Sequence, residues 1–100
     1  PKLRDKIRAV RTARNAAWAL TREAMGRDRI EAVTAMRVLW CPPDRRSRDD
    51  DNLVARFKSQ RDGIAQALGV DDATFRPVHD FSGPIIRGGR VIVTIEAISA

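Results

Sequence analysis

Cysteine, histidine and long apolar segments are scarce in this chain of 100 residues. It contains one cysteine, Cys41, and one histidine, His79. A single cysteine excludes an intrachain disulfide and a cysteine-rich zinc site, and no motif links these two residues as a catalytic pair. Cys41 is better interpreted as a buried structural thiol. Since the chain has neither a signal peptide nor a long apolar run, we expect a soluble cytoplasmic protein without a membrane partner.

The composition is that of one globular domain with a basic surface. Hydrophobic residues make up 43% and charged residues 32%, which favours a single domain over residues 1–100 with one modest core. The formal net charge is +6 and the sequence pI is about 11.0. Such a balance favours polyanionic partners, nucleic acid first, although many small soluble proteins are also basic.

Apolar periodicity predicts two main helices. In residues 2–25 the apolar side chains recur at spacings of three and four, and Gly26 is a natural stop. A second helix is predicted from about Asp51 to Leu68, with Asp50 or Asp51 as N-cap and Gly69 as C-cap. The expected apolar stripes are Leu3, Ile7, Val10, Ala13, Ala17, Leu20 and Ala24 in the first helix, and Leu53, Phe57, Ile64 and Leu68 in the second.

Three segments are predicted to be strands. Residues 31–40 carry apolar groups on both faces, which suits a central strand, and the Cys41-Pro42-Pro43 segment ends it. Residues 74–80 form a weaker strand bordered by Pro77, and Arg90 to Ile98 alternates in the manner of a half-buried strand. The order helix, strand, helix, strand, strand predicts an α/β or α+β domain. Its small mixed sheet of about three strands would have the two helices packed on it.

The feature with the clearest chemical meaning is a basic loop that leads into a cluster of acids. Its residues are Arg45-Arg46-Ser47-Arg48-Asp49-Asp50-Asp51-Asn52-Leu53. Adjacent carboxylates repel one another unless a cation shares them, and Asp49 and Asp51 can point into the same space at a loop-to-helix junction. Hard divalent cations prefer such oxygen ligands, and arginine suits phosphate oxygens. The cluster therefore predicts metal-dependent phosphodiester chemistry on nucleic acid.

Each of these residues also has a plainer interpretation. Aspartates commonly cap helices, and Asp71 and Asp72 are expected in a turn unless the fold returns them to the metal site. Lys58 lies on the helix face that begins at Asp51 and could approach a bound phosphate. An ordinary surface ion pair with Asp62 is slightly favoured over that role. The basic residues of the first helix form either a solvated face or a ridge that binds the DNA backbone. Trp18 and Trp40 are expected in the core or at a dimer contact.

Three other chemistries are rejected by spacing and length. An EF-hand that starts at Asp49 needs a metal ligand, a glycine and an acid at three positions where this chain has Leu53, Val54 and Gln60. No motif supports a Ser-His-Asp triad. A nucleotide-sugar transferase needs a domain larger than this chain provides.

From Pro43 to its last strand, the sequence resembles the RusA-type Holliday junction resolvases, small endodeoxyribonucleases of phages and prophages. The likeness lies in the segment from Pro43 to Leu53, in Asp71-Asp72-Ala73 and in Gly88-Gly89-Arg90. It implies a RusA-like fold and an enzyme that depends on Mg²⁺, for which Mn²⁺ can substitute. That enzyme would act as a homodimer on branched DNA, resolving four-way junctions by paired nicks during recombination and repair in a bacterial or phage-infected cell.

The resemblance also assigns roles to residues. The three catalytic, metal-holding aspartates of the family match Asp49, Asp51 and Asp72. The family's functional lysine falls at Ala55 here, and we assign its role to Lys58, on the same helix face one turn later. The family's N-terminal strand is expected to be missing, because this chain starts directly in its first helix. The expected DNA-binding residues are Arg45, Arg46, Arg48, Arg56, Lys58, Arg8 and Arg11.

Two other classes of function remain open. A non-catalytic DNA-binding module of the same fold would also use the positive charge, and a structural dimerisation domain would use the acids only as a helix cap. The nuclease is favoured because a pure DNA-binding protein gains nothing from three acids beside its cationic loop. Without a metal, those acids repel phosphate.

Overall fold

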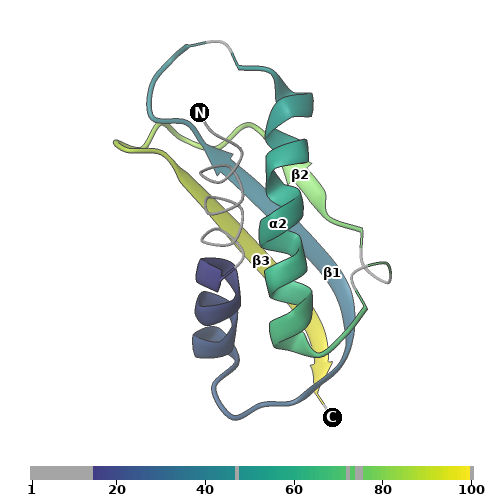
Figure 1. The fold of residues 1–100 in the computed structure, drawn as a ribbon. Helices are drawn as coiled ribbons and strands as arrows, with labels where there is room; N and C mark the ends of the chain where they lie inside the picture. Colours follow the sequence, from purple (N-terminus) through teal and green to yellow (C-terminus); the bar gives the residue numbers. More distant parts are fainter. Residues whose placement is uncertain (1–14, 47, 72, 74–75, 100) are drawn as a thin grey trace, which may run out of the picture.

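A computed structural model describes residues 15–46, 48–71, 73 and 76–99. It contains a helix over residues 15–25, strand β1 (Ile30–Cys41), helix α2 (Asp50–Leu68), and strands β2 (Val78–Asp80) and β3 (Arg90–Ser99), as shown in Figure 1. The predicted α+β class with a three-stranded mixed sheet and two helices is therefore confirmed. Of the predicted first helix, residues 1–14 lie outside the described part, and Arg8 and Arg11 lie there with them.

The sheet has the strand order β2-β1-β3. As predicted, the strand with apolar residues on both faces is central: β1 pairs in parallel with β2 and antiparallel with β3. The predicted strand over residues 74–80 is wrong in extent, because β2 comprises Val78–Asp80 alone within the described residues. Pro77 has no backbone N–H to donate to a neighbouring strand, which accounts for the late start of β2.

The core lies between the sheet and α2. Both helices cover the same face of the sheet (Figure 1). Met36 and Val38 of β1 are buried against α2, whose apolar stripe is confirmed as buried except for the half-buried Leu53. The buried members of this stripe are Phe57, Ile64 and Leu68.

Helix α2 begins one residue earlier than predicted, and its N-cap is different. The N-cap is Asp49, whose extended backbone (φ −82°, ψ 109°) precedes the helix, and not Asp50 or Asp51. Asp50 and Asp51 occupy the first turn, where their negative charges favour the positive end of the helix dipole. Gly69 adopts the predicted left-handed C-cap conformation (φ 73°) and donates its N–H to the carbonyl oxygens of Ala65 and Gln66.

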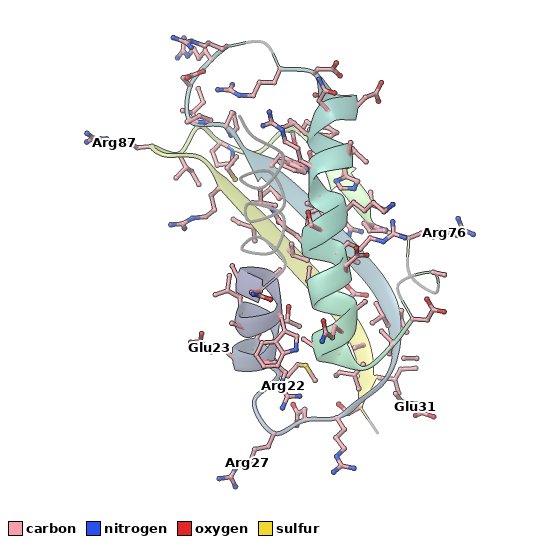
Figure 2. The ribbon with its side chains drawn as sticks, in the orientation of Figure 1. Arg22, Glu23, Arg27, Glu31, Arg76 and Arg87 are labelled. Atoms are coloured by element: carbon pink, nitrogen blue, oxygen red, sulfur yellow. The ribbon has the colours of Figure 1, made fainter. Side chains whose placement is uncertain are left out.

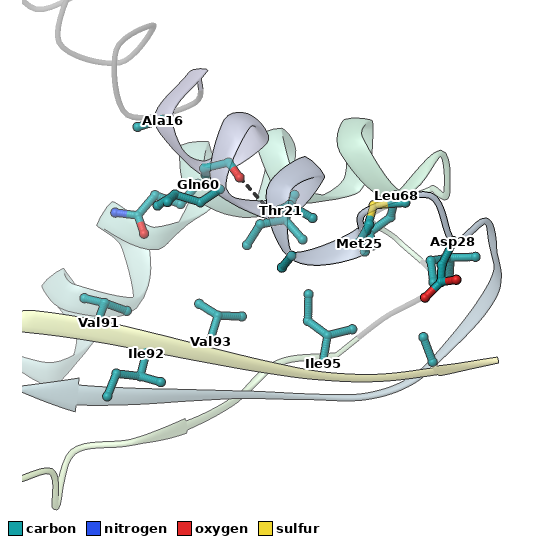
Figure 3. Close-up of a pocket in the computed structure, with 16 residues that line it drawn as sticks. Ala16, Thr21, Met25, Asp28, Gln60, Leu68, Val91, Ile92, Val93 and Ile95 are labelled. Atoms are coloured by element: carbon teal, nitrogen blue, oxygen red, sulfur yellow. Dashed lines mark hydrogen bonds between the residues drawn. The ribbon is translucent and has the colours of Figure 1, made fainter. Parts of the chain in front are cut away.

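The first helix packs differently from its predicted stripe. Ala17, Thr21 and Met25 face the protein, and the Thr21 hydroxyl donates a 2.7 Å hydrogen bond to the Ala17 carbonyl. Leu20, placed in the buried stripe by its spacing, is 67% exposed. The reason is a hollow of about 660 Å³ between this helix, α2 and β3 (Figure 3), which leaves space where a close contact was expected.

The connection between β2 and β3 folds back on the end of β1. The Ile86 N–H donates a 2.9 Å hydrogen bond to the Pro42 carbonyl, and Gly83 lies so close to the Trp40 carbonyl and the Cys41 Sγ that no side chain fits there. Cys41 is 3% exposed, as predicted for a structural thiol. This connection brings the end of β2 and the start of β3 to the carboxyl end of β1, where α2 begins.

Candidate nucleic-acid interface

The carboxylate of Asp49 caps α2. Its Oδ1 accepts hydrogen bonds from the backbone N–H groups of Asp51 (3.0 Å) and Asn52 (3.4 Å), and its Oδ2 accepts one from Asn52 Nδ2 (3.2 Å). A carboxylate can accept about four hydrogen bonds, so these three leave some capacity for a further ligand. Asp49 is exposed, so a cation could approach it from the solvent side.

Asp51 is the second acid at this junction, and it is exposed in the first turn of α2. Asp49 and Asp51 together present oxygen donors of the type that Mg²⁺ and Mn²⁺ prefer. The donor chemistry therefore fits a hard divalent cation. Across the described ranges, however, no group of three Asp, Glu, His or Cys side chains is arranged to hold a metal ion.

The third predicted metal ligand, Asp72, lies outside the described residues. Its neighbour Asp71 follows the C-terminal end of α2, and the Asp71 Oδ1 accepts a 3.0 Å hydrogen bond from the Ala73 N–H. This hydrogen bond stabilises a turn, which is the role expected of Asp71. A helix of 19 residues is roughly 28 Å long at 1.5 Å per residue, so Asp71 and Asp49 lie at opposite ends of α2.

The basic loop before α2 is held together by Arg48 and Asp44. The Arg48 guanidinium donates to the Asp44 Oδ1 at 2.8 Å and to the backbone carbonyls of Asp44 (3.2 Å) and Arg46 (2.8 Å). The Arg46 N–H also donates to Asp44 Oδ1, at 2.9 Å. This bond and the Arg48 contact hold the pKa of Asp44 below its usual value. Arg48, predicted as a phosphate clamp, thus shapes the loop, while Arg45 and Arg46 are exposed.

A second hollow of about 580 Å³ lies at the carboxyl end of β1. Its cationic lining comes from three segments: the basic loop (Arg46, Arg48), α2 (Arg56) and the start of β3 (Arg90). Among the residues that the structure describes, Asp50 is the one acid of the lining. We call this hollow the arginine pocket; its other lining residues are Trp40, Cys41, Pro42, Pro43, Leu53, Phe81, Gly88, Gly89 and Val91.

Lys58 lies apart from this pocket on the exposed surface of α2. The ion pair with Asp62 that its spacing favoured is absent among the described residues. The Lys58 ammonium is therefore not held by that acid. Its predicted role near a bound phosphate stays a prediction.

Aromatic rings gather beside the arginine pocket. Trp40 lies nearly parallel to His79 (ring centroids 6.0 Å apart, 28° between planes) and to Phe81 (6.1 Å, 15°). Phe57 meets Trp40 edge-on at 6.3 Å, which ties the group to the core, as predicted for Trp40. Sequence reasoning missed His79 and Phe81. Their spacing of two, which puts both rings on one face of an extended segment, was the signal available in the sequence.

Comparison with known proteins adds one relative. No protein-family model matches the sequence, and no solved structure matches it. The chain is similar to an uncharacterized protein of Xylella fastidiosa (strain Temecula1), with 39% identity over 97 residues. The match covers 94% of this chain and 63% of that protein, so the chain spans less than two thirds of the relative's length. None of the helices in the described ranges is long and apolar enough to cross a membrane.

Proposed function

We propose that this protein is a metal-dependent, structure-selective endodeoxyribonuclease of the RusA type, which resolves four-way DNA junctions. The observation that carries the proposal is the placement of two exposed carboxylates, Asp49 and Asp51, at the N-terminus of α2 beside the arginine pocket. Acids next to a cationic surface disfavour phosphate unless a metal ion intervenes, so the combination favours a nuclease over a simple DNA-binding surface.

Different residues of the chain would bind the metal ion and the DNA. Asp49 and Asp51 would hold the cation, and the capping bonds of Asp49 would keep its carboxylate in place. Arg45, Arg46 and Arg56 would neutralise backbone phosphates on the same end of the domain. Arg48 keeps the loop in its bent form through Asp44. When bound, Mg²⁺ or Mn²⁺ supplies an activated water and stabilises charge on the scissile phosphate.

The proposal includes a homodimer, and the length of α2 bears on how such a dimer would work. Asp71 and Asp49 occupy opposite ends of a helix roughly 28 Å long, so Asp71 cannot join the acid cluster of its own chain. If Asp72 acts with Asp49 and Asp51, the simplest arrangement is that a second copy supplies it. A two-fold dimer would then hold two such shared sites, which matches the two opposed strands of a junction.

A second candidate is a non-catalytic DNA-binding module of the same fold. The observation that favours it is the capping role of Asp49, which gives this acid a structural reason to exist without a metal. This candidate predicts binding that weakens steeply with salt and no cleavage under any metal condition.

The deciding experiment is cleavage of a synthetic four-way DNA junction with Mg²⁺, with Mn²⁺ and with EDTA, in parallel with a linear duplex of the same sequence. Paired nicks on opposed strands of the junction, present with either metal and absent with EDTA, support the resolvase. Equal cleavage of the duplex would contradict its structure selectivity. Tight binding to the junction without nicks would favour the DNA-binding module.

A further inference from the structure

We propose that the arginine pocket seats one nucleotide unit of a DNA strand, with its phosphate on the arginines and its base against Trp40 and Phe81. The inference rests on the proposed function for the identity of the ligand. It adds three residues of the pocket, Arg90, Trp40 and Phe81, to the DNA-binding surface.

Three of the four arginines of the pocket are available to bind an anion. Arg48 is engaged with Asp44 and with loop carbonyls. By contrast, the guanidinium groups of Arg46, Arg56 and Arg90 make no hydrogen bond or ion pair with any described residue. Around one hollow, three guanidinium groups without a partner in the described part of the chain face one described acid, Asp50, and make a positive site suited to phosphate oxygens.

Arg90 lies far from Arg46 and Arg56 in the sequence, and the fold brings it to them. Arg90 is the first residue of β3 and pairs with Cys41, the last residue of β1. Gly88 (φ 84°) and Gly89 (φ 72°) adopt the left-handed conformation that places Arg90 at this end of the sheet. The Gly89 N–H donates a 2.8 Å hydrogen bond to the Ile86 carbonyl, which closes the turn.

The rest of the pocket suits a nucleobase. Trp40 and Phe81 are half-buried, line the same hollow and lie 15° from parallel. Aromatic faces bind bases of any sequence, at roughly 1–3 kcal/mol per stacked base. A volume of about 580 Å³ lies within the range of pockets that hold small organic ligands. A hollow lined by both cationic groups and aromatic rings matches the two halves of a nucleotide.

The pocket also lies where a nuclease would need its strand. Asp50, which lines the pocket, stands between Asp49 and Asp51 in the chain. A nucleotide in the pocket would therefore place the next phosphate of the strand near the two proposed metal ligands. A free nucleotide has the same chemistry, and the experiment separates it from a strand.

The test uses the tryptophan inside the pocket as its probe. In a full-length chain carrying Trp18→Phe, the emission of Trp40 is followed during titration with inorganic phosphate, with thymidine monophosphate and with a short oligothymidylate. Binding of the same oligothymidylate carrying a fluorescent label is measured independently by fluorescence anisotropy. Arg90→Ala and Arg56→Ala are compared with Arg87→Ala, which removes the same charge from a side chain that points away from the domain (Figure 2).

We expect the oligonucleotide to change Trp40 emission and to bind more tightly than the mononucleotide, with phosphate the weakest of the three. Arg90→Ala and Arg56→Ala should each weaken oligonucleotide binding by roughly three- to tenfold. Each should also reduce the slope of log affinity against log salt concentration by about 0.7 per lost phosphate contact. Arg87→Ala should change the affinity less than about twofold. Thermal unfolding of each variant checks that its fold is intact.

Several results would overturn the inference. One is an equal loss of affinity in Arg87→Ala and Arg90→Ala, which would mean that net charge alone drives binding. Another is an unchanged Trp40 emission at saturation, and a third is a mononucleotide that binds as tightly as the oligonucleotide, which would identify a free nucleotide as the ligand. If the protein does not cleave junctions but the pocket variants weaken oligonucleotide binding as expected, the proposed nuclease is contradicted and the nucleotide-binding pocket is still supported.

Discussion

The indole Nε1 of Trp40 donates a 3.0 Å hydrogen bond to Nδ1 of His79. This bond links the ends of two parallel strands, β1 and β2, on the side of the sheet that faces α2. It requires a lone pair on Nδ1, so the imidazole that accepts it is neutral with its proton on Nε2. The bond thus couples the packing of Trp40, beside the arginine pocket, to the protonation state of the chain's single histidine.

We expect the stability of the protein to decrease in mild acid because of His79. Burial and, second, the positive charge of Arg61 lower the pKa of His79 below its ordinary value of 6.5. The unfolded chain therefore binds this proton more readily than the folded chain. The free energy of unfolding should be at its plateau above pH 6.5 and fall as the pH drops through 6.5 towards the lowered pKa.

The measurement is the thermal unfolding midpoint between about pH 7.5 and about pH 5, a range in which histidine is the side chain expected to titrate. His79→Gln, which keeps a hydrogen-bond acceptor for Trp40, should show a much flatter profile. A wild-type midpoint that stays constant over this range would show that His79 protonates equally in both states.

Loss of the Asp49 cap should destabilise the protein independently of any metal. Asp49→Ala removes the acceptor for the N–H groups of Asp51 and Asn52 and should lower the free energy of unfolding by about 1 kcal/mol. Asp49→Asn keeps a capping oxygen and should stay within about 0.5 kcal/mol of wild type. Urea denaturation in EDTA measures both. The same loss in Asp50→Ala, which removes no cap, would contradict the assignment of Asp49 as the N-cap.

Cleavage should depend on Asp51 and not on its neighbour Asp50. Asp51→Asn should reduce metal-dependent nicking of a four-way junction by at least about 100-fold, because a proposed metal ligand is lost. Junction binding should persist or tighten, since one negative charge near the phosphates is removed. Asp50→Asn makes the same charge change and should still cleave. Gel-based cleavage and anisotropy on the same preparations check this, and normal nicking by Asp51→Asn would end the proposed role.

A shared site predicts recovery of activity when two inactive chains are mixed. Asp51→Asn and Asp72→Asn should each be inactive alone. If Asp72 of one copy completes the site of the other, each mixed dimer carries one intact site and one doubly mutated site. In an equal mixture about half of the dimers are mixed, so about a quarter of the sites of the wild type should return. Single nicks should reappear in a strand-resolved junction assay. A mixture as inactive as its components would mean that each site is built from one chain.

The main elements could be predicted because local chemistry dictates them. Gly69 ends α2, the alternation of Val91, Val93 and Ile95 defines β3, and two-sided apolarity places β1 at the centre. The errors arise where tertiary contacts decide the outcome. Leu20 has the spacing of a core residue but borders a hollow that the helix does not close.

The sequence indicated which residues form the candidate site, but not which other residues they contact. Asp49, Asp51 and the arginines of the basic loop lie at the junction before α2, whereas Asp72, Arg8 and Arg11 lie outside the described residues. Sequence could not show that Arg48 would turn back to Asp44, because that contact depends on the loop's bend after Pro43. Arg90 was noticed as part of a family motif. Its meeting with Arg56 and Trp40 follows from the antiparallel register of β3 against β1.

The capping bonds of Asp49 have an evolutionary consequence. A lineage that stopped cutting DNA would still benefit from an aspartate at this position, because the helix loses stability without an acceptor there. Asp51, whose side chain accepts no hydrogen bond from the backbone of the described residues, would be free to change in such a lineage. Under the proposed function, retention of Asp51 among related chains would therefore be the informative record of catalysis, whereas retention of Asp49 would record the need for a stable helix.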